Sequence, residues 1–209
     1  SGLKLPFKVA GAIEFKHQAI FNPVKYLYQI ALYLKDLPNC EIYEDTRVID
    51  RNENLVKTEH GSIRAKDIIY ATHYPVFFDL RQTLAYPYRS YIIAARVKED
   101  VGDDVYWDTY DPYHYTRSYV KNDQRYLVVG GADHKTGTNE NNPFGKLESY
   151  LRERYTVESI DYQWSSQYYE PADGLPYIGK SSNGNEYLAT GYSGDGLTNG
   201  TIAGYLITQ

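Results

Sequence analysis

Apolar residues near the start of the chain recur at the spacing of one helical face. These positions are Leu27, Ile30, Ala31 and Leu34. Asparagine is a favoured helix cap and proline a favoured first helical residue, so Asn22-Pro23 predicts a helix from Pro23 to about Asp36. Residues 12–15 alternate between apolar and polar side chains, which predicts a short strand before this helix.

After residue 40 the pattern changes to that of strands. Short extended runs predict strands at residues 41–44, 46–49, 55–58, 62–65, 67–71, 90–97, 105–109, 114–120, 125–129 and 161–166. His60-Gly61 predicts a hairpin, and Asp-Pro and Asn-Asp pairs predict turns between the middle strands. Asn142-Pro143 predicts a second helix to about Tyr155, so the expected fold class is α+β, or mixed α/β.

The end of the chain combines an extended run, a glycine-rich turn and a helix. The turn reads Gly191-Tyr-Ser-Gly-Asp-Gly196, and the helix is predicted from Leu197 to Ile207. A strand, a turn and a helix start in this order direct unpaired backbone N–H groups and the positive end of the helix dipole toward one point. The turn is therefore expected to face an electron-rich ring or an anion, and a plain glycine turn is the alternative.

Composition narrows the class of protein. The 209 residues allow one large domain or two small ones, and 42% hydrophobic and 23% charged residues are typical of an ordinary globular protein. The net charge of −5 argues against nucleic-acid binding, and no apolar run is long enough to cross a membrane. The single cysteine, Cys40, excludes an internal disulfide and fits a reducing, cytoplasmic setting. The lack of methionine, even at residue 1, suggests a piece of a longer protein.

The spacing of the histidines does not indicate a metal site. All five are scattered without the spacing of metal ligands, so no metal site is expected. His73 ends an apolar strand, where ligand contacts gather in α/β sheets, and a histidine that only caps the strand end is the alternative. Asp133-His134 follows another strand, and a turn held by Asp133 is favoured over a catalytic role.

Tyrosine is unusually frequent, with 24 residues in the chain. A run of them in the middle could line a pocket for an aromatic or apolar substrate, or could simply pave a half-buried sheet. The run comprises Tyr106, Tyr110, Tyr113, Tyr115 and Tyr119. The cations best placed on strands to bind a carboxylate are Arg89, Arg96 and Arg117.

Six motifs occur in an order that resembles a known family. They are Gln18-Ala-Ile-Phe-Asn-Pro-Val-Lys-Tyr-Leu27, Ile42-Tyr-Glu-Asp-Thr-Arg-Val48, Ala71-Thr-His-Tyr-Pro75, Val129-Gly-Gly-Ala-Asp-His134, Pro171-Ala-Asp-Gly-Leu-Pro-Tyr-Ile-Gly179 and Ala189-Thr-Gly-Tyr-Ser-Gly-Asp-Gly-Leu-Thr-Asn-Gly200. Nearly the whole chain resembles the FAD-dependent oxidoreductases of the D-amino-acid oxidase and glycine oxidase superfamily. Within it, the chain is similar to the bacterial branch that carries a C-terminal Rieske iron–sulfur domain.

This resemblance implies two domains whose segments interleave. Residues 1–16 and 80–170 would form a substrate domain with an antiparallel-rich sheet, and residues 17–79 and 171–209 would be segments of an FAD-binding domain. The cofactor-binding residues it implies are Arg47, Val48, Ala71, Thr72, His73, Gly191, Gly194, Asp195, Gly196, Leu197 and Thr198. Candidate catalytic residues are His73 and Tyr115, and candidate substrate-binding residues are Arg89, Arg117 and Tyr168.

The chain also departs from the family pattern. The Gly-x-Gly-x-x-Gly fingerprint that grips the pyrophosphate is absent and would lie upstream of Ser1, so this piece is expected to hold FAD weakly or not at all. A Rieske domain would lie beyond Gln209. Amino-acid oxidases place an arginine at the position of Tyr168, and glycine oxidases place another at that of Gly194, so an amine or another C–N or C–H donor becomes a candidate substrate. Asp195 would either cap the last helix or tune the flavin.

The function implied is oxidation of a C–N or C–H bond of an amine-like or amino-acid-like small molecule, by hydride transfer to FAD. Two alternatives use fewer of these features. One is a tyrosine-rich module that binds a small ligand without redox chemistry, and the other is an assembly domain.

Overall fold

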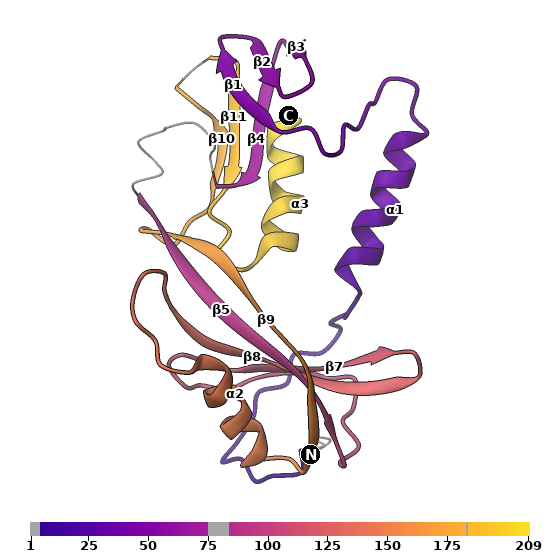
Figure 1. The fold of residues 1–209 in the computed structure, drawn as a ribbon, viewed down its shortest axis with the longest axis vertical. Helices are drawn as coiled ribbons and strands as arrows, with labels where there is room; N and C mark the ends of the chain where they lie inside the picture. Colours follow the sequence, from indigo (N-terminus) through magenta and orange to yellow (C-terminus); the bar gives the residue numbers. More distant parts are fainter. Residues whose placement is uncertain (1–4, 75–83, 183) are drawn as a thin grey trace. The chain divides into compact units, whose positions relative to one another are not determined.

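The structure is a computed structural model, and it describes residues 5–74, 84–182 and 184–209 (Figure 1). Its elements are α1 (Pro23–Lys35), β1 (Val48–Asn52), β2 (Leu55–Thr58), β3 (Ser62–Arg64), β4 (Ile68–His73), β5 (Ala85–Val97), β6 (Val105–Trp107), β7 (Tyr115–Lys121), β8 (Gln124–Lys135), α2 (Pro143–Arg152), β9 (Val157–Pro171), β10 (Tyr177–Lys180), β11 (Glu186–Thr190) and α3 (Gly196–Ile207). The sheets are mostly antiparallel, which confirms the predicted α+β class.

The chain folds into two compact units. Of the described residues, unit 1 contains 5–12, 84–175 and 191–194. Unit 2 contains 13–74, 176–182, 184–190 and 195–209. Each unit therefore draws on segments that are distant in sequence, and the glycine-rich turn after β11 belongs to unit 1 while the helix that follows it belongs to unit 2.

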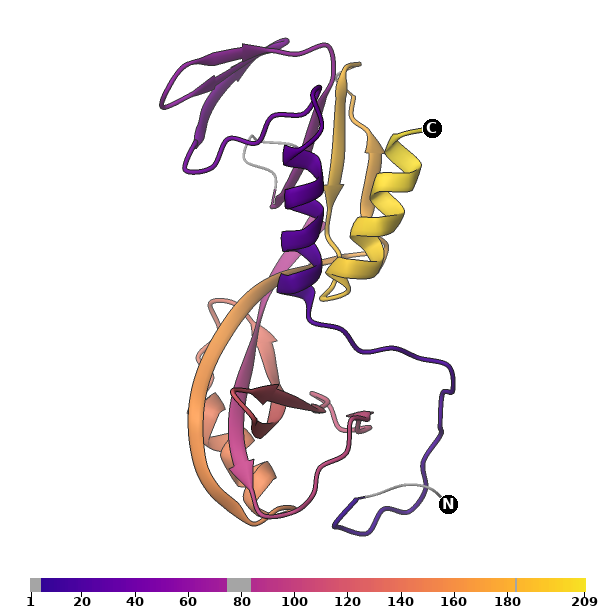
Figure 2. The same cartoon turned by 90° about the vertical axis from the view of Figure 1, so that its right-hand side faces the viewer.

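Unit 1 is built on a five-stranded antiparallel sheet in the order β6-β7-β8-β5-β9. Helix α2 covers one face, where its Leu147 and Leu151 are fully buried against Ile93 and Val129 of the sheet. Figure 2 shows β5 and β9 curving together along their length. Two irregularities in their pairing fit this curvature, because a bulge bends the strand that carries it.

The two faces of this sheet differ in character. Tyr91 contacts Phe144 of α2, so the odd-numbered residues of β5 face the helix. The even-numbered residues, among them Tyr88 and Ser90, lie on the other face, which we call the tyrosine face. Residues paired with them across the sheet share this side. The tyrosine face comprises Tyr88, Ser90, Ile92, Tyr115, Gly130, Ser166 and Tyr168.

Unit 2 contains two three-stranded sheets, in the orders β1-β2-β3 and β10-β11-β4. In the second sheet β4 and β11 run parallel, whereas β10 is antiparallel to β11. Helix α3 packs on β10 and β11 and buries Ala203 (Figure 1). Parallel strands need a long connection, and here it includes residues 84–175 of unit 1.

Helix α1 forms as its sequence predicts, since the Asn22 side chain accepts a hydrogen bond from the Lys25 amide at 3.1 Å. It has no buried residue within the described structure, and Leu27 of the predicted apolar face is 54% exposed. The strands predicted at residues 12–15 and 41–44 were wrong, because these segments are irregular. Alternating polarity produces a strand only where a partner strand completes its hydrogen bonds, and neither segment pairs with one among the described residues.

Candidate functional site

The carboxyl ends of β4 and β11 lie side by side in unit 2. Thr190 pairs with His73, and the Thr190 hydroxyl donates a hydrogen bond to the His73 carbonyl at 2.5 Å. His73 has a φ of 63°, in the left-handed region that non-glycine residues seldom occupy. Ligands of α/β sheets gather at such strand ends, and this edge carries three of the predicted cofactor residues, Ala71, Thr72 and His73, all exposed.

The N-terminus of α3 presents free backbone donors in the same unit. The first N–H groups of a helix have no partner within it, and here they belong to Gly196, Leu197 and Thr198, which are exposed. Asp195 occupies the cap position, but its side chain makes no capping hydrogen bond. The capping role considered for Asp195 is therefore not the one it has in this structure.

An open and mainly apolar pocket of about 520 Å³ adjoins this helix start. Leu197 and Thr198 form part of its wall, and Phe21 and Tyr26 contribute aromatic rings that meet edge to face at 5.4 Å between centroids. Exposed amides beside an apolar, aromatic wall suit a flat ring that carries polar atoms on one edge.

The glycine-rich turn itself is anchored on unit 1. The Ser193 amide donates to the Tyr169 carbonyl of β9 at 3.2 Å. Gly191 and Gly194 have φ values of 73° and 88°, which glycine adopts without strain. A methyl group built on Gly194 would have no neighbour within 4 Å, so the backbone there is open to a ligand. The turn thus holds two predicted cofactor residues next to the strand that carries Tyr168.

Arg47 and Val48, the other predicted cofactor residues, lie at the start of β1. The Arg47 carbonyl accepts a hydrogen bond from the Glu59 amide at 3.1 Å, and Val48 pairs with Thr58. These contacts tie them to the β2–β3 hairpin. Their part in binding a cofactor stays a prediction.

The tyrosine face of unit 1 brings polar groups from four strands together. The Tyr115 hydroxyl lies 3.3 Å from the Ser90 Oγ. Tyr168 stacks on Tyr88 with 5.8 Å between ring centroids, and its hydroxyl donates to Asp133 Oδ2 at 3.0 Å. Burial, and next the Asp133 carboxylate, raise the pKa of the Tyr168 hydroxyl, so it remains a neutral donor near pH 7.

Asp133 joins the polar groups of the tyrosine face, a position that sequence reasoning did not predict. The expected turn held by Asp133 was wrong, because the residue lies within β8 and bonds to a tyrosine 35 positions away in the sequence. Gly131 and Ala132 have φ values of 147° and 53°, and this irregular backbone precedes Asp133 directly. The Gly-Gly pair in the sequence was the feature that could have indicated it, since glycines inside a strand often mark a bulge.

The three predicted substrate-binding residues do not share one face. Tyr168 lies on the tyrosine face, and so does Arg117, which pairs with Val128. Arg89 lies on the α2 side, where its guanidinium donates to the Ser165 hydroxyl at 2.9 Å. A carboxylate clamp that combines Arg89 with Tyr168 is therefore not formed by this sheet.

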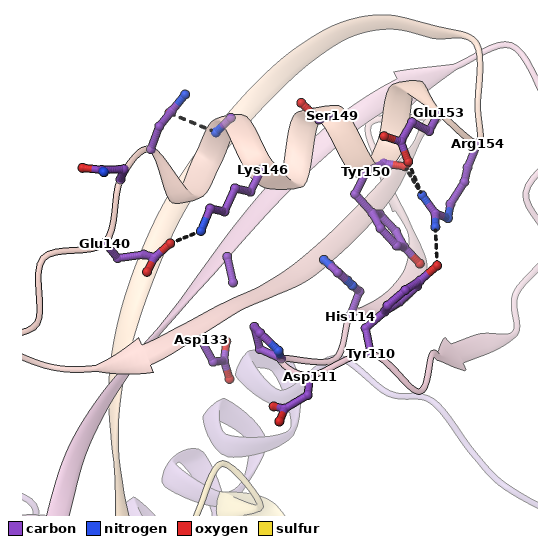
Figure 3. Close-up of a pocket in the computed structure, with 15 residues that line it drawn as sticks. Tyr110, Asp111, His114, Asp133, Glu140, Lys146, Ser149, Tyr150, Glu153 and Arg154 are labelled. Atoms are coloured by element: carbon purple, nitrogen blue, oxygen red, sulfur yellow. Dashed lines mark hydrogen bonds and ion pairs between the residues drawn. The ribbon is translucent and has the colours of Figure 1, made fainter.

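An open cavity of about 670 Å³ lies between α2 and the loop before β7 (Figure 3). His114 stacks on Tyr150 at 3.9 Å, and the Arg154 guanidinium lies 3.9 Å from the centroid of the same ring. Asp108 orients the imidazole, with 2.9 Å between its Oδ2 and His114 Nδ1. Burial raises the pKa of the Tyr150 hydroxyl, and the Asp108 charge adds to the effect. Of the predicted tyrosine run, Tyr110 lines this cavity.

The ring of Tyr115 packs so closely against Gly130 that no side chain fits at this position. A Cβ atom built on Gly130 would lie 2.0 Å from Tyr115 Cζ, far inside van der Waals contact. Gly130→Ala is therefore expected to lower the free energy of unfolding by about 1–3 kcal/mol, the usual cost of overpacking. Urea titration would measure it. In a Tyr115→Ala background the same change should be nearly neutral, and an equal loss in both backgrounds would contradict the contact.

Comparison with known proteins identifies the class. The family model described as FAD dependent oxidoreductase matches residues 2–209, so the chain belongs to this family, and the resemblance seen in the sequence is confirmed. FAD is the cofactor that this family uses.

One protein of similar sequence and one solved structure of similar fold show how the chain compares with longer proteins. YhfW of Bacillus subtilis (strain 168), whose name describes it as a Rieske 2Fe-2S iron–sulfur protein, is 29% identical over 99% of this chain and 42% of its own length. The crystal structure of glycine oxidase from Geobacillus kaustophilus superposes with a TM-score of 0.58 at 18% identity, over 80% of this chain and 48% of that chain. The chain spans less than half the length of both.

Among the residues that the structure describes, no helix has the length and apolar character that a membrane span requires.

Proposed function

We propose that this chain is part of an enzyme that oxidises an amine-like or amino-acid-like small molecule at a C–N or C–H bond, with hydride transfer to FAD. The observation that carries the proposal is the exposed start of α3. Its uncapped amides stand beside an apolar pocket, in the unit where β4 and β11 end side by side. Membership in the FAD-dependent oxidoreductase family supplies the cofactor.

The residues present fit the ring end of FAD. The amides of Gly196, Leu197 and Thr198, with the positive end of the α3 dipole, would stabilise the negative charge that a reduced flavin carries near N1 and C2=O. Phe21 and Tyr26 would contact the ring system from the pocket wall. We assign residues 17–79 and 171–209 to FAD binding and residues 1–16 and 80–170 to the substrate. When bound, FAD accepts the hydride.

The remaining task of the chain is to hold the substrate in place. The hydroxyls of Tyr115 and Tyr168 stay protonated, because burial raises the pKa of each. The Tyr115 hydroxyl can donate a hydrogen bond to the substrate, whereas the Tyr168 hydroxyl already donates to Asp133 and can only accept one. In the reaction the substrate C–H bond breaks, its hydrogen leaves with the electron pair as hydride, and the nitrogen lone pair forms a C=N bond. Orientation and charge stabilisation suffice for this step when the nitrogen is neutral, and a substrate bound as an ammonium ion first loses one proton to solvent, so no side chain has to act as acid or base. His73, at the strand end, would line the cofactor site.

The name of the Bacillus relative supports a further part of the proposal, namely that the parent protein carries a Rieske [2Fe–2S] domain. One experiment tests the flavin claim directly. The full-length parent protein should be yellow, and its flavin absorbance should bleach without oxygen when a substrate amine or amino acid is added. A colourless protein that still binds small ligands would favour the non-redox binding module instead.

A further inference from the structure

We propose that Asp133 binds a protonated amino group of the substrate, so that the enzyme acts on cationic amines that lack a neighbouring carboxylate. This inference rests on the proposed function, because it takes unit 1 as the substrate domain. It goes further in naming the recognition group and the charge of the ligand.

The first argument is the unsatisfied oxygen of Asp133. One carboxylate oxygen, Oδ2, accepts the hydrogen bond from Tyr168. The other, Oδ1, is fully buried and has no hydrogen-bond partner within the described structure. A buried acceptor without a donor costs free energy, and a charged one costs more, so such an atom in a folded protein calls for an explanation. An ammonium group is a donor that would satisfy both its hydrogen-bonding need and its charge.

The second argument is the charge around Asp133. Tyr168 and Tyr115 report on it, because the Tyr168 hydroxyl donates to this carboxylate and the Asp133 charge also acts on the Tyr115 hydroxyl. Burial is the main cause that raises the pKa of each, and the charged groups that act on them are Asp133 and, for Tyr168, also Glu170. No lysine or arginine is among these influences in the described part of the chain. A negative environment attracts a cation and repels a substrate carboxylate.

The third argument is that two arginines of this sheet and the nearest lysine are engaged elsewhere, while Arg117 shares the tyrosine face but pairs with Val128, five positions along β8 from Asp133. Arg89 lies on the α2 face and bonds to Ser165. Arg96 is paired with Asp161 at 3.0 Å. Lys135, two residues beyond Asp133, lies with its ammonium 4.3 Å above the ring of Tyr86. Tyr168 donates its hydroxyl hydrogen to Asp133 itself.

A cavity on the α2 side also borders Asp133, and a ligand there would reach Oδ1 after the carboxylate turns from Tyr168, because this oxygen is buried in the structure. Asp133 lines the cavity of about 670 Å³, together with Tyr110, Pro112 and His114 (Figure 3). This volume is within the range of small-molecule sites and exceeds what a single aromatic amine needs. The aromatic rings of the wall would cover the apolar part of such a ligand, while the carboxylate selects its charged end.

The test compares two probes of similar shape and opposite charge, benzylammonium and benzoate, by isothermal titration calorimetry on the full-length protein at pH 7. The wild type should bind benzylammonium more tightly. Asp133→Asn keeps the side-chain shape and should weaken benzylammonium binding by about 10- to 100-fold, the equivalent of one charged hydrogen bond, while benzoate binding stays equal or improves. Asp161→Asn removes the same charge from the same sheet, at the Arg96 pair, and should leave both affinities unchanged.

Thermal unfolding separates recognition from a structural role. Asp133→Asn should leave the midpoint unchanged or raise it, because it removes a buried and partly unsatisfied charge. Tyr168→Phe keeps the carboxylate, and it should keep the preference for the cation even if Asp133→Asn fails to fold. Tighter binding of benzoate by the wild type, or unchanged benzylammonium binding by folded Asp133→Asn, would overturn the inference. A colourless protein that prefers benzylammonium would overturn the flavin proposal and leave the role of Asp133 standing.

Discussion

Replacing Arg51 by methionine is expected to destabilise unit 2 by about 3–5 kcal/mol, because the change leaves a buried carboxylate without its cation. Arg51 Nη1 lies 2.9 Å from Glu186 Oε1, and its Nη2 donates to Oε2 at 3.2 Å. The Glu186 side chain is only 4% exposed. Arg51 Nε also donates to the Tyr70 hydroxyl at 3.1 Å, so one guanidinium joins β1 to both β4 and β11.

A control variant distinguishes the loss of the buried Arg51–Glu186 ion pair from the general effect of removing a positive charge. Lys57→Met breaks an exposed pair with Asp50 in the same hairpin, and it should cost no more than about 1 kcal/mol. The double variant Arg51→Met with Glu186→Leu should be more stable than Arg51→Met alone, because it removes the uncompensated charge as well. Urea titration and hydrogen exchange of the β4 and β11 amides would measure these differences. Equal effects of Arg51→Met and Lys57→Met would contradict the account.

This ion pair was beyond what the sequence could predict. Arg51 and Glu186 are 135 positions apart, and each sits in a short strand whose local pattern gives no partner. The helices were predicted well, because Asn22 and Asn142 cap them through bonds to residues three positions on. Strand positions were predicted less well. The alternation at residues 12–15 is local, whereas pairing is a tertiary property that no short segment contains.

The same limit applies to the candidate site. The strand, turn and helix start at the end of the chain are contiguous, so their geometry could be predicted from the sequence. The sequence could not predict which face of β5 is covered by a helix. Arg89 and Tyr91 alternate with Tyr88 and Ser90, and both sets mix polar with aromatic residues. The contact between Asp133 and Tyr168 depends on an irregular backbone in β8 and on a strand two positions away in the sheet, so it became visible only in the fold.

Gly196→Pro is expected to lower the flavin midpoint potential of the full-length protein by roughly 30–60 mV, if one charge-assisted hydrogen bond to the reduced ring is lost. Gly196 is the first residue of α3, where proline is tolerated in a helix and removes only the N–H group. The rate of substrate oxidation should fall by about tenfold or more, as when one donor to a developing negative charge is deleted. Potentiometric titration and stopped-flow bleaching would measure the two effects.

Gly196→Ala provides the matched control, because it keeps the N–H group. A Cβ atom at this position would have no neighbour within 4 Å, so this variant should match the wild type in potential and rate. The contrast isolates the amide from any effect of side-chain bulk. If both variants had the wild-type potential while Gly196→Pro still bound FAD, the start of α3 would not face the reduced ring. Such a result would mean that the flavin is bound elsewhere. The negative charge of the reduced ring would then not lie beside the carboxylate of Asp195, which occupies the cap position but makes no capping hydrogen bond.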